Sequence, residues 1–287
     1  MHGAKVAGRT HGKVLNDKIS SQVSAFISSN TKRSDIELSS LKTELSFIHS
    51  YANELYRNSL ILEALNVLEP LLSYITQLKA HRYQIDLLQV RCFILKAKLL
   101  RSKMQYGVAR DYYTHAYDAL YELANKKTSK KDYVFYQQKL ATIDAGFASI
   151  NLLRGHVTRA FKDIRDAQFK LIYSENIIDG LYLQILEGGI KRAKAGYDEN
   201  RLRQAEKILL NTYKELAKHS IFRDMLLAAR ELAETYIFKR EFDKATIYIN
   251  EIKRLADGRF DDGKRRDVRP IDNRRWQVTA DILTALC

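Results

Sequence analysis

The sequence predicts an all-α protein, a right-handed α-α superhelix of about five helical hairpins. Three observations predict this fold class. The chain has 287 residues but only 2 Pro and 12 Gly, and strand-rich proteins rely on these residues for their frequent turns. The good helix formers Leu, Ala, Lys, Glu and Arg are abundant. Apolar residues recur at helical spacing from about residue 15 onward.

The N-terminal part is expected to begin with a flexible segment, residues 1–14. A short helix follows, whose apolar stripe is Leu15, Ile19, Val23 and Ile27. Ser34 or Asp35 is suited to cap the next helix, because short polar side chains accept hydrogen bonds from the first free backbone N–H groups. That helix continues as one apolar face from Ile36 to Leu55.

Apolar-periodic segments then come in pairs. The expected helices span 58–78, 82–103, 106–125, 132–154, 157–174, 177–197, 200–218, 220–239 and 242–257. Pro70 is expected to interrupt the first of these, and a lysine-rich link at 126–131 divides the third from the fourth. Breaks are expected near Gly155, Asn176, Asp198–Asn200, His219 and Arg240. The repeat domain is therefore predicted to cover 15–257.

The C-terminal part, residues 258–287, departs from this pattern. Its first residues carry Gly258, Gly263, Pro270 and many charges, which indicates a basic loop. A last helix is expected at about 272–285, with Trp276, Val278, Ile282 and Leu283 on its apolar side. A repeat stack needs a cap at its end, so this helix is predicted to be the cap.

The paired segments repeat a pattern of small and large residues. Residues 232–252 show it best, with Leu232, Ala233, Tyr236, a turn at 239–242, Ala245 and Ile249. This spacing resembles the tetratricopeptide family. The alanines that align in the second helices are Ala64, Ala109, Ala160, Ala205 and Ala245, and the small residues in the first helices are Ala52, Ala97, Ala148, Ala193 and Ala233. The second-helix alanines are 40 to 51 residues apart, more than the family's roughly 34, so the resemblance is to a long-hairpin type.

The resemblance implies a concave groove lined by first-helix residues. By offset, the expected partner-binding residues are Asn53, Tyr56, Arg57, Arg91, Lys98, Arg101, Lys194, Tyr197 and Arg230. The carboxylate clamp of the family is matched at Asn53 alone. His49 stands where a lysine is expected, and Leu95, Thr142 and Gly146 do not match the other positions. A receptor that uses this clamp for chaperone tails is therefore not expected.

The formal net charge is +14 and the pI is about 9.6, which suits an acidic protein, a nucleic acid or an anionic membrane surface. The leading hypothesis is a non-enzymatic scaffold or adaptor that binds an acidic segment of another protein in a basic concave groove, as a subunit of a larger complex. One alternative is a peptide- or ligand-responsive regulator of transcription or signalling. The other is an RNA- or DNA-associated factor whose contacts would come from two basic clusters: Lys126, Lys127, Lys130 and Lys131, and Arg265, Arg266 and Arg269.

Catalysis is not expected, because each motif sought has a missing residue. Gly188-Gly189 lacks the Lys-Ser or Lys-Thr of a phosphate-binding loop, so close helix packing or a kink is predicted there. His and Cys are not at metal-ligand spacing, and no metal or cofactor is expected. Cys92 and Cys287 are too few for a disulfide framework, which favours a reducing compartment, the cytoplasm or alternatively the nucleus. No apolar stretch approaches the ~20 residues of a membrane span.

Overall fold

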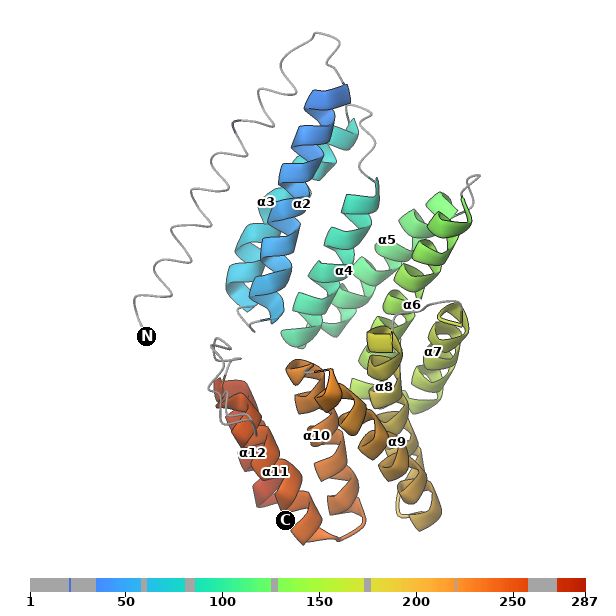
Figure 1. Cartoon of the computed structure of the whole chain (residues 1–287), viewed down its shortest axis with the longest axis vertical. Helices are drawn as coiled ribbons and strands as arrows, with labels where there is room; N and C mark the ends of the chain where they lie inside the picture. The colour runs from blue at the N-terminus through green and yellow to red at the C-terminus, as the bar shows by residue number, and fades with distance from the viewer. Residues whose placement is uncertain are drawn as a thin grey trace. The chain divides into compact units, whose positions relative to one another are not determined.

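The computed structural model describes residues 21, 35–57, 61–80, 86–124, 129–172, 177–219, 221–257 and 273–287. Within these ranges every regular element is an α-helix, and consecutive helices pack in pairs (Figure 1). The predicted all-α class is thus confirmed. The predicted flexible segment 1–14, the short helix with Leu15 to Ile27 and the basic loop up to residue 272 lie outside the described residues.

The chain divides into two compact units, Met1–Lys127 and Thr128–Cys287. The boundary falls inside the lysine-rich link at 126–131. The first unit contains α2 (Asp35–Arg57), α3 (Ile61–Ala80), α4 (Asp86–Ser102) and α5 (Tyr106–Ala124). Helix α2 pairs with α3, and α4 pairs with α5. Helix α4 also contacts α3 and α2, so the first helices of the two pairs touch each other.

The second unit repeats this arrangement. Its helices are α6 (Lys130–Leu153), α7 (Val157–Lys170), α8 (Ile177–Ala195), α9 (Glu199–Lys218), α10 (Phe222–Phe238), α11 (Phe242–Ala256) and α12 (Asn273–Ala285). The pairs are α6 with α7, α8 with α9 and α10 with α11, and α12 packs on α11. Each later first helix contacts both helices of the pair before it: α8 contacts α6 and α7, and α10 contacts α8 and α9.

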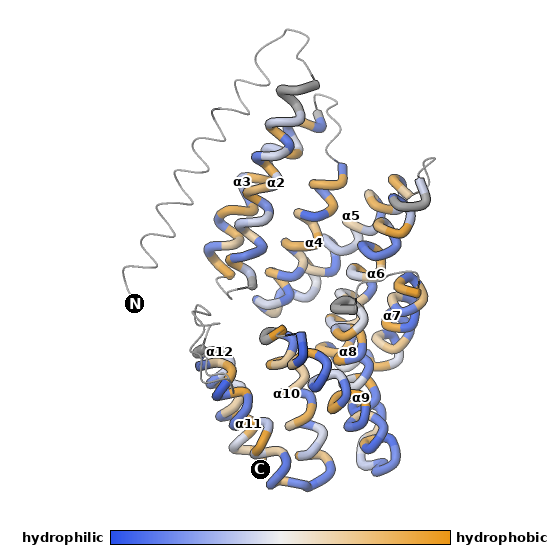
Figure 2. Tube along the Cα trace, viewed as in Figure 1, coloured by the Kyte–Doolittle hydropathy of each residue, from blue (hydrophilic) through white to orange (hydrophobic). Residues whose placement is uncertain are grey.

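The second helices are hydrophilic on one side and hydrophobic on the other, as α9 and α11 show (Figure 2). Their buried side begins with an alanine. Ala64, Ala109, Ala160 and Ala245 are each the fourth residue of their helix, and all four are fully buried. Ala205 is also buried, but it is the seventh residue of α9. Leu202 holds the fourth place there, so Ala205 is not the structural equivalent that the sequence alignment predicted.

The turns between paired helices close in the same way in three cases. The backbone N–H groups of Gln105, His156 and Glu241 donate to the carbonyl oxygens of Leu100, Asn151 and Tyr236. In each turn the preceding residue has a left-handed conformation: Met104 (φ 61°), Gly155 (φ 76°) and Arg240 (φ 58°). This backbone pattern is the Schellman closure that satisfies the last carbonyls of a helix. Asn151 occupies the position that Tyr236 has in the α10–α11 turn. The residue type can differ there because the bond uses only the main-chain carbonyl oxygen.

The turn between α8 and α9 is one residue longer. Its left-handed residue, Gly196 (φ 55°), stands two positions before the N-cap Asp198 instead of one. Ala97, Ala148 and Ala233 each lie seven residues before the left-handed turn residue, and all are buried. In α8 this place belongs to Gly189. Ala193, the small residue predicted from the sequence, is exposed. The extra turn residue shifted the alignment, and the prediction for Ala193 is wrong.

The two glycines of α8 mark close helix packing, as predicted. A Cβ atom on Gly188 would lie 2.5 Å from Cγ of Leu209 in α9. A Cβ atom on Gly189 would lie 2.8 Å from Oε2 of Glu231 in α10. Both distances are below van der Waals contact. The two glycines therefore let α8 lie close to both α9 and α10.

Two other local predictions are corrected. Helix α3 runs unbroken through Pro70, although an interior proline costs about 3 kcal/mol. The burial of Leu68, Leu71 and Ile75 around it offsets this cost. In α12, Trp276, Ala280 and Leu283 are buried. Val278 and Ile282, which were expected on the buried side, are 50% and 58% exposed. The contact with α11 covers a narrower side of α12 than its apolar residues occupy.

Candidate binding surfaces on the first helices

Helix α4 carries three basic residues on one accessible side, which also holds the exposed Leu87. Arg91, Lys98 and Arg101 are half-buried, and their spacing of seven and three residues places them on the same side of the helix. The buried residues of α4, which pack it into the first unit, are Leu88, Val90, Cys92, Ile94, Leu95, Lys96, Ala97, Leu99 and Leu100. We call Arg91, Lys98 and Arg101 the α4 basic face.

The acidic residue of α4 itself pairs with another helix. Asp86 is the single acidic residue of α4, and it pairs with Lys79 of α3 at 2.9 Å. Lys96 lies on another side of α4, where its Nζ is 2.6 Å from Oε2 of Glu69 and 4.6 Å from the centre of the Tyr112 ring. The one carboxylate and the one remaining lysine of α4 are therefore engaged away from the α4 basic face.

Arg91 makes a two-point contact with His49 of α2. Nη2 of Arg91 donates to Nδ1 of His49 at 3.2 Å, and Nε2 of His49 donates to the backbone carbonyl oxygen of Arg91 at 3.3 Å. This assignment of hydrogen atoms follows from the contacts, because an arginine can only donate and a carbonyl can only accept. His49 is 7% exposed. The residue that departs from the clamp pattern of the family thus holds one residue of the basic face.

The other residues of α2 that were predicted to bind a partner differ in their exposure. Asn53 is half-buried, one turn beyond His49. Tyr56 is 4% exposed and belongs to the core of the first unit, where it packs with Ala52 and Leu55. A partner cannot reach this ring in the structure, so the sequence-based place of Tyr56 in a binding surface is corrected. Arg57 is the last residue of α2, and its side chain is outside the described part.

The predicted residues of the second unit do not form one basic surface. Nζ of Lys194 lies 3.7 Å from the centre of the Phe161 ring in α7. Tyr197 is 81% exposed, and the centre of its ring is 6.3 Å from that of Phe238 in α10. Arg230 belongs to a group of charges between α8 and α10. Three different neighbours therefore engage the three residues.

The charged group between α8 and α10 consists of Arg192, Arg230, Glu231 and Glu234. Arg192 donates to Glu231 at 2.8 Å and also pairs with Glu234, and Arg230 pairs with both carboxylates. Burial disfavours the charged form of Glu231, but the two guanidinium groups outweigh it and lower its pKa. Burial and the neighbouring Glu231 raise the pKa of Glu234. Two positive and two negative charges cancel, so this part of the surface is not net basic, contrary to the sequence-based expectation.

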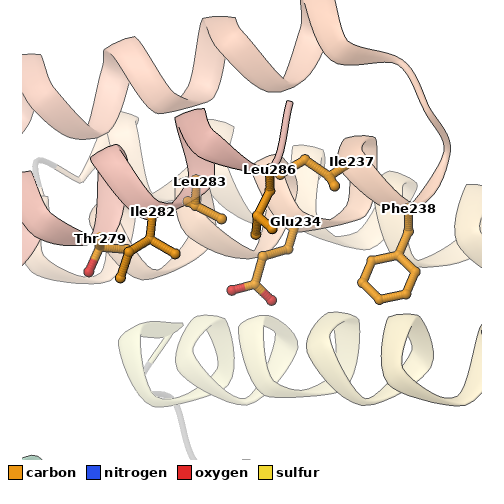
Figure 3. Close-up of a pocket in the computed structure, with 7 residues that line it drawn as sticks. All are labelled: Glu234, Ile237, Phe238, Thr279, Ile282, Leu283 and Leu286. Atoms are coloured by element: carbon orange, nitrogen blue, oxygen red, sulfur yellow. The ribbon is translucent and has the colours of Figure 1, made fainter.

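An apolar pocket of about 300 Å³ lies between α10 and α12 (Figure 3). Glu234 is the single charged residue that lines it, and its carboxylate points toward α8. The lining residues are Glu234, Ile237, Phe238, Thr279, Ile282, Leu283 and Leu286. The pocket could hold an apolar side chain. Sequence reasoning missed it because the exposed side of α12 was assigned to the core.

The residues proposed for nucleic-acid contact cannot be placed. Lys126, Lys127, Arg265, Arg266 and Arg269 lie outside the described residues, and the side chains of Lys130 and Lys131, in the first turn of α6, are outside them too. Of the tyrosines in α5, Tyr113 is fully buried, and Tyr117 and Tyr121 stack on each other with ring centres 6.3 Å apart. The nucleic-acid interpretation remains a prediction.

The chain's single buried cysteine and the grouping of its polar side chains bear on catalysis and metal binding. Cys92 is fully buried, and burial raises the pKa of its thiol well above the usual value in spite of the nearby Arg91, as expected of a structural cysteine. Among the described residues, no three His, Cys, Asp or Glu side chains gather where they could hold a metal ion. No helix in the described ranges has the length and apolarity to cross a bilayer. Comparison of the chain with protein-family models, curated proteins and solved structures finds no match.

Proposed function

We propose that this protein is a non-enzymatic interaction scaffold, and that the α4 basic face binds an acidic segment of a partner protein. We also propose that its helix pairs belong to a right-handed superhelix of the tetratricopeptide-like, long-hairpin type. In such a scaffold the first helices of successive pairs line the binding surface.

The helix contacts support the superhelical part of the proposal. In both units the first helices of successive pairs touch each other, and each second helix touches the first helix of the next pair. Three turns share one hydrogen-bond pattern, and the same small position precedes each left-handed residue by seven residues. Repeats that each contact only their neighbours are the basis of solenoid stability.

The binding part rests on a single observation, which is that α4 presents Arg91, Lys98 and Arg101 together on one accessible side. A helix with nine buried residues holds Arg91, Lys98 and Arg101 at fixed spacing. Guanidinium and ammonium groups form charge-assisted hydrogen bonds with carboxylates, and these are stronger than hydrogen bonds between neutral groups. An acidic peptide in extended or helical form is the partner that this arrangement fits best.

Binding can be measured with a twelve-residue peptide rich in Asp, labelled with a rhodamine dye, by fluorescence anisotropy. The peptide with Asn in place of every Asp is the reference. We expect the acidic peptide to bind and the Asn peptide not to bind. The double variant Lys98→Glu with Arg101→Glu should weaken binding at least about tenfold, because two attractive contacts become repulsive. Added salt should weaken binding by the wild-type protein, since the contacts are partly exposed.

The matched control is Lys207→Glu with Lys214→Glu, which makes the same charge change at two exposed positions of α9. This variant should keep most of the affinity. Equal losses in both variants would show that only net charge matters and would refute the α4 basic face. A single-stranded RNA of the same charge tests the nucleic-acid alternative, which would be favoured if the RNA bound and the peptide did not.

A further inference from the structure

Helix α7 presents a line of exposed side chains on the side opposite its core contacts. The line consists of Thr158, Lys162, Arg165, Phe169 and Ile172, all of them exposed. Successive members are four, three, four and three residues apart, which is the spacing of residues along the contact between two paired helices. The buried Ala160, Ile164 and Ala167 lie on the other side of α7. We call the five exposed residues the α7 outer stripe.

The last two residues of the α7 outer stripe are large and apolar. Phe169 is 73% exposed and Ile172 is 64% exposed. Ile172 follows the C-cap Leu171, and its backbone N–H donates to the carbonyl oxygen of Phe169 at 3.3 Å, so the chain still turns as in a tight helix there. Neither side chain belongs to the apolar core that α7 shares with α6 and α8. The fold therefore does not need apolar residues at these two places.

The other second helices carry polar residues at the place of Phe169. This place is nine positions after the fourth residue of the helix. It holds Ser73 in α3, Asp118 in α5, Asn211 in α9 and Arg254 in α11. The place of Ile172, three positions later, holds Thr76, Tyr121, Lys214 and Asp257. Among these five second helices α7 alone has two apolar residues at these outward places, which indicates that they have a role other than folding.

The middle of the α7 outer stripe is positively charged. Lys162 and Arg165 are one turn apart and both exposed. The two acidic residues of α7 lie outside the stripe. Asp163 accepts a hydrogen bond from Nδ2 of Asn151 in α6 at 2.6 Å, and Asp166 is exposed to one side of the stripe. The stripe itself therefore combines two cations with two apolar side chains along one line.

This combination decides what can cover the stripe. A second copy of the chain does not fit, because the cations of one copy would face either the cations or the apolar residues of the other. A lipid surface fits poorly, because an interfacial helix has a wide apolar side and carries its cations on the opposite side. In α7 the opposite side is packed on α6 and α8. A helix with two carboxylates and two apolar side chains at the same spacing satisfies both halves of the stripe.

We propose that the α7 outer stripe is a second docking surface, which pairs with an amphipathic helix of a partner protein. The partner helix places two acidic residues opposite Lys162 and Arg165, and two large apolar residues opposite Phe169 and Ile172. The apolar contacts supply affinity by removing exposed apolar surface from water, and the charge pairs set the register. This surface lies in the second unit and does not depend on the α4 basic face, which lies in the first.

The probe is an alanine-rich peptide of about eighteen residues, long enough to form a helix, labelled with fluorescein. It carries Glu, Glu, Leu and Leu at intervals of three, four and three residues. A second peptide has the reverse order, for an antiparallel partner. We expect one of the two to bind the wild-type protein in fluorescence anisotropy, and the same peptide with Gln in place of Leu not to bind.

The apolar half is tested by Phe169→Ser with Ile172→Thr, which installs the residues that α3 has at these places. This variant should weaken binding at least about tenfold, because two apolar contacts are lost. The matched control is Val108→Thr with Ile247→Thr, at places in α5 and α11 that are 48% and 63% exposed. The control should keep the affinity of the wild type.

The charged half is tested by an exchange of charges. Lys162→Glu with Arg165→Glu should weaken binding of the Glu peptide at least about tenfold, and should bind the peptide that has Lys in place of Glu, because the two pairs are restored with opposite sign. A stripe that served only the stability of α7 would not reverse its preference in this way.

Four results would overturn the docking surface. The first is that the wild type binds neither peptide, and the second is that the control loses as much affinity as the Phe169→Ser, Ile172→Thr variant. The third is binding to phosphatidylserine vesicles, or dimerisation in sedimentation, that this variant abolishes while no peptide binds. The fourth is loss of peptide binding in Lys98→Glu with Arg101→Glu, which would assign the binding to the α4 basic face. If that variant binds these peptides like the wild type, the docking surface stands whether or not the proposed function does.

Discussion

Met104 and Arg240 hold a backbone conformation that usually belongs to glycine. Their φ angles of 61° and 58° match the role of Gly155, with φ 76°, in the corresponding turn of the pair α6–α7. A side chain in this region costs roughly 1–2 kcal/mol, because Cβ comes close to the following carbonyl oxygen. The shared hydrogen bond of the three turns holds the conformation in spite of this cost. Two of these turns therefore contain local strain that a glycine would relieve.

Substitution by glycine should stabilise both turns. We expect Met104→Gly and Arg240→Gly each to raise the free energy of unfolding by up to about 1 kcal/mol, because the relief of strain exceeds the entropy that glycine adds to the unfolded chain. Gly155→Ala should lower it by about 1 kcal/mol for the opposite reason. Urea denaturation followed by circular dichroism measures all three. A loss of stability in Arg240→Gly as large as that in Gly155→Ala would show that the left-handed conformation is not strained.

At the residue scale, the sequence predicted burial better than contacts. Val90, Phe93 and Ile94 around Cys92 indicate a buried thiol from the sequence alone, and Cys92 is buried in the structure. The role of His49 could not be predicted, because Arg91 is 42 residues away and periodicity gives only the side of a helix that a residue occupies. The ion pairs of Arg230 could not be predicted for the same reason. Its sequence context indicates a cation on a first helix, but its carboxylate partners and Arg192 become neighbours only when α8 and α10 pack.

Helix α8 shows how a single element depends on two glycines. Leu209 of α9 fills the space over Gly188, and Glu231 of α10 fills the space over Gly189. A side chain at position 188 would therefore clash with an apolar residue, and one at position 189 would clash with a charged residue. Gly180 in the same helix has open space at the place of a Cβ atom. The three glycines offer a controlled comparison within one helix.

The two substitutions Gly188→Ala and Gly180→Ala should have opposite effects. We expect Gly188→Ala to lower the free energy of unfolding by about 1–3 kcal/mol, because the buried Leu209 must move. Gly180→Ala should raise it by about 0.5–1 kcal/mol through the better helix propensity of alanine. Thermal and urea denaturation of the two variants measure the difference. Equal effects of the two substitutions would mean that α8 and α9 are not in close contact at Gly188.

At the element scale, the bounds of the helices were predictable from the sequence. The residues that occupy equivalent positions in successive helix pairs were not. Period-3.6 apolar spacing predicted the described helices to within a few residues, as for 106–125 against Tyr106–Ala124. The fifth repeat was misaligned because the turn after α8 has one extra residue, and a degenerate repeat gives no signal of such an insertion. The unbroken course of α3 was missed because propensity places a break at Pro70, whereas the burial around it decides the outcome.

At the scale of the whole molecule, the chain consists of two compact units that meet at residues 127 and 128. The first unit carries the α4 basic face and the contact between His49 and Arg91. The second carries the compensated charges of α8 and α10 and the apolar pocket beside α12. The lysine-rich link is visible in the sequence, but nothing in its composition indicates that a compact unit ends there rather than at another break.

We expect the two units to unfold in separate transitions. Multi-unit chains commonly depart from two-state behaviour, and differential scanning calorimetry should resolve two peaks. Gly188→Ala should then shift the peak of Thr128–Cys287 and leave the other unchanged. Met104→Gly should shift the peak of Met1–Lys127 alone. A single peak that moves as a whole with either substitution would show that the chain unfolds as one cooperative unit.

The charge group of Arg192, Arg230, Glu231 and Glu234 also bears on how this protein can change in evolution. Loss of one guanidinium leaves two carboxylates to share the other, and an uncompensated buried charge costs several kcal/mol, whereas replacement of a whole group by apolar residues can be neutral. Glu231 also fills the space over Gly189, so a larger residue at 189 requires a smaller one at 231. These five positions, spread over two helices, are therefore expected to be inherited together and exchanged together. Such joint changes would leave a covariation signal between α8 and α10 in any set of related sequences.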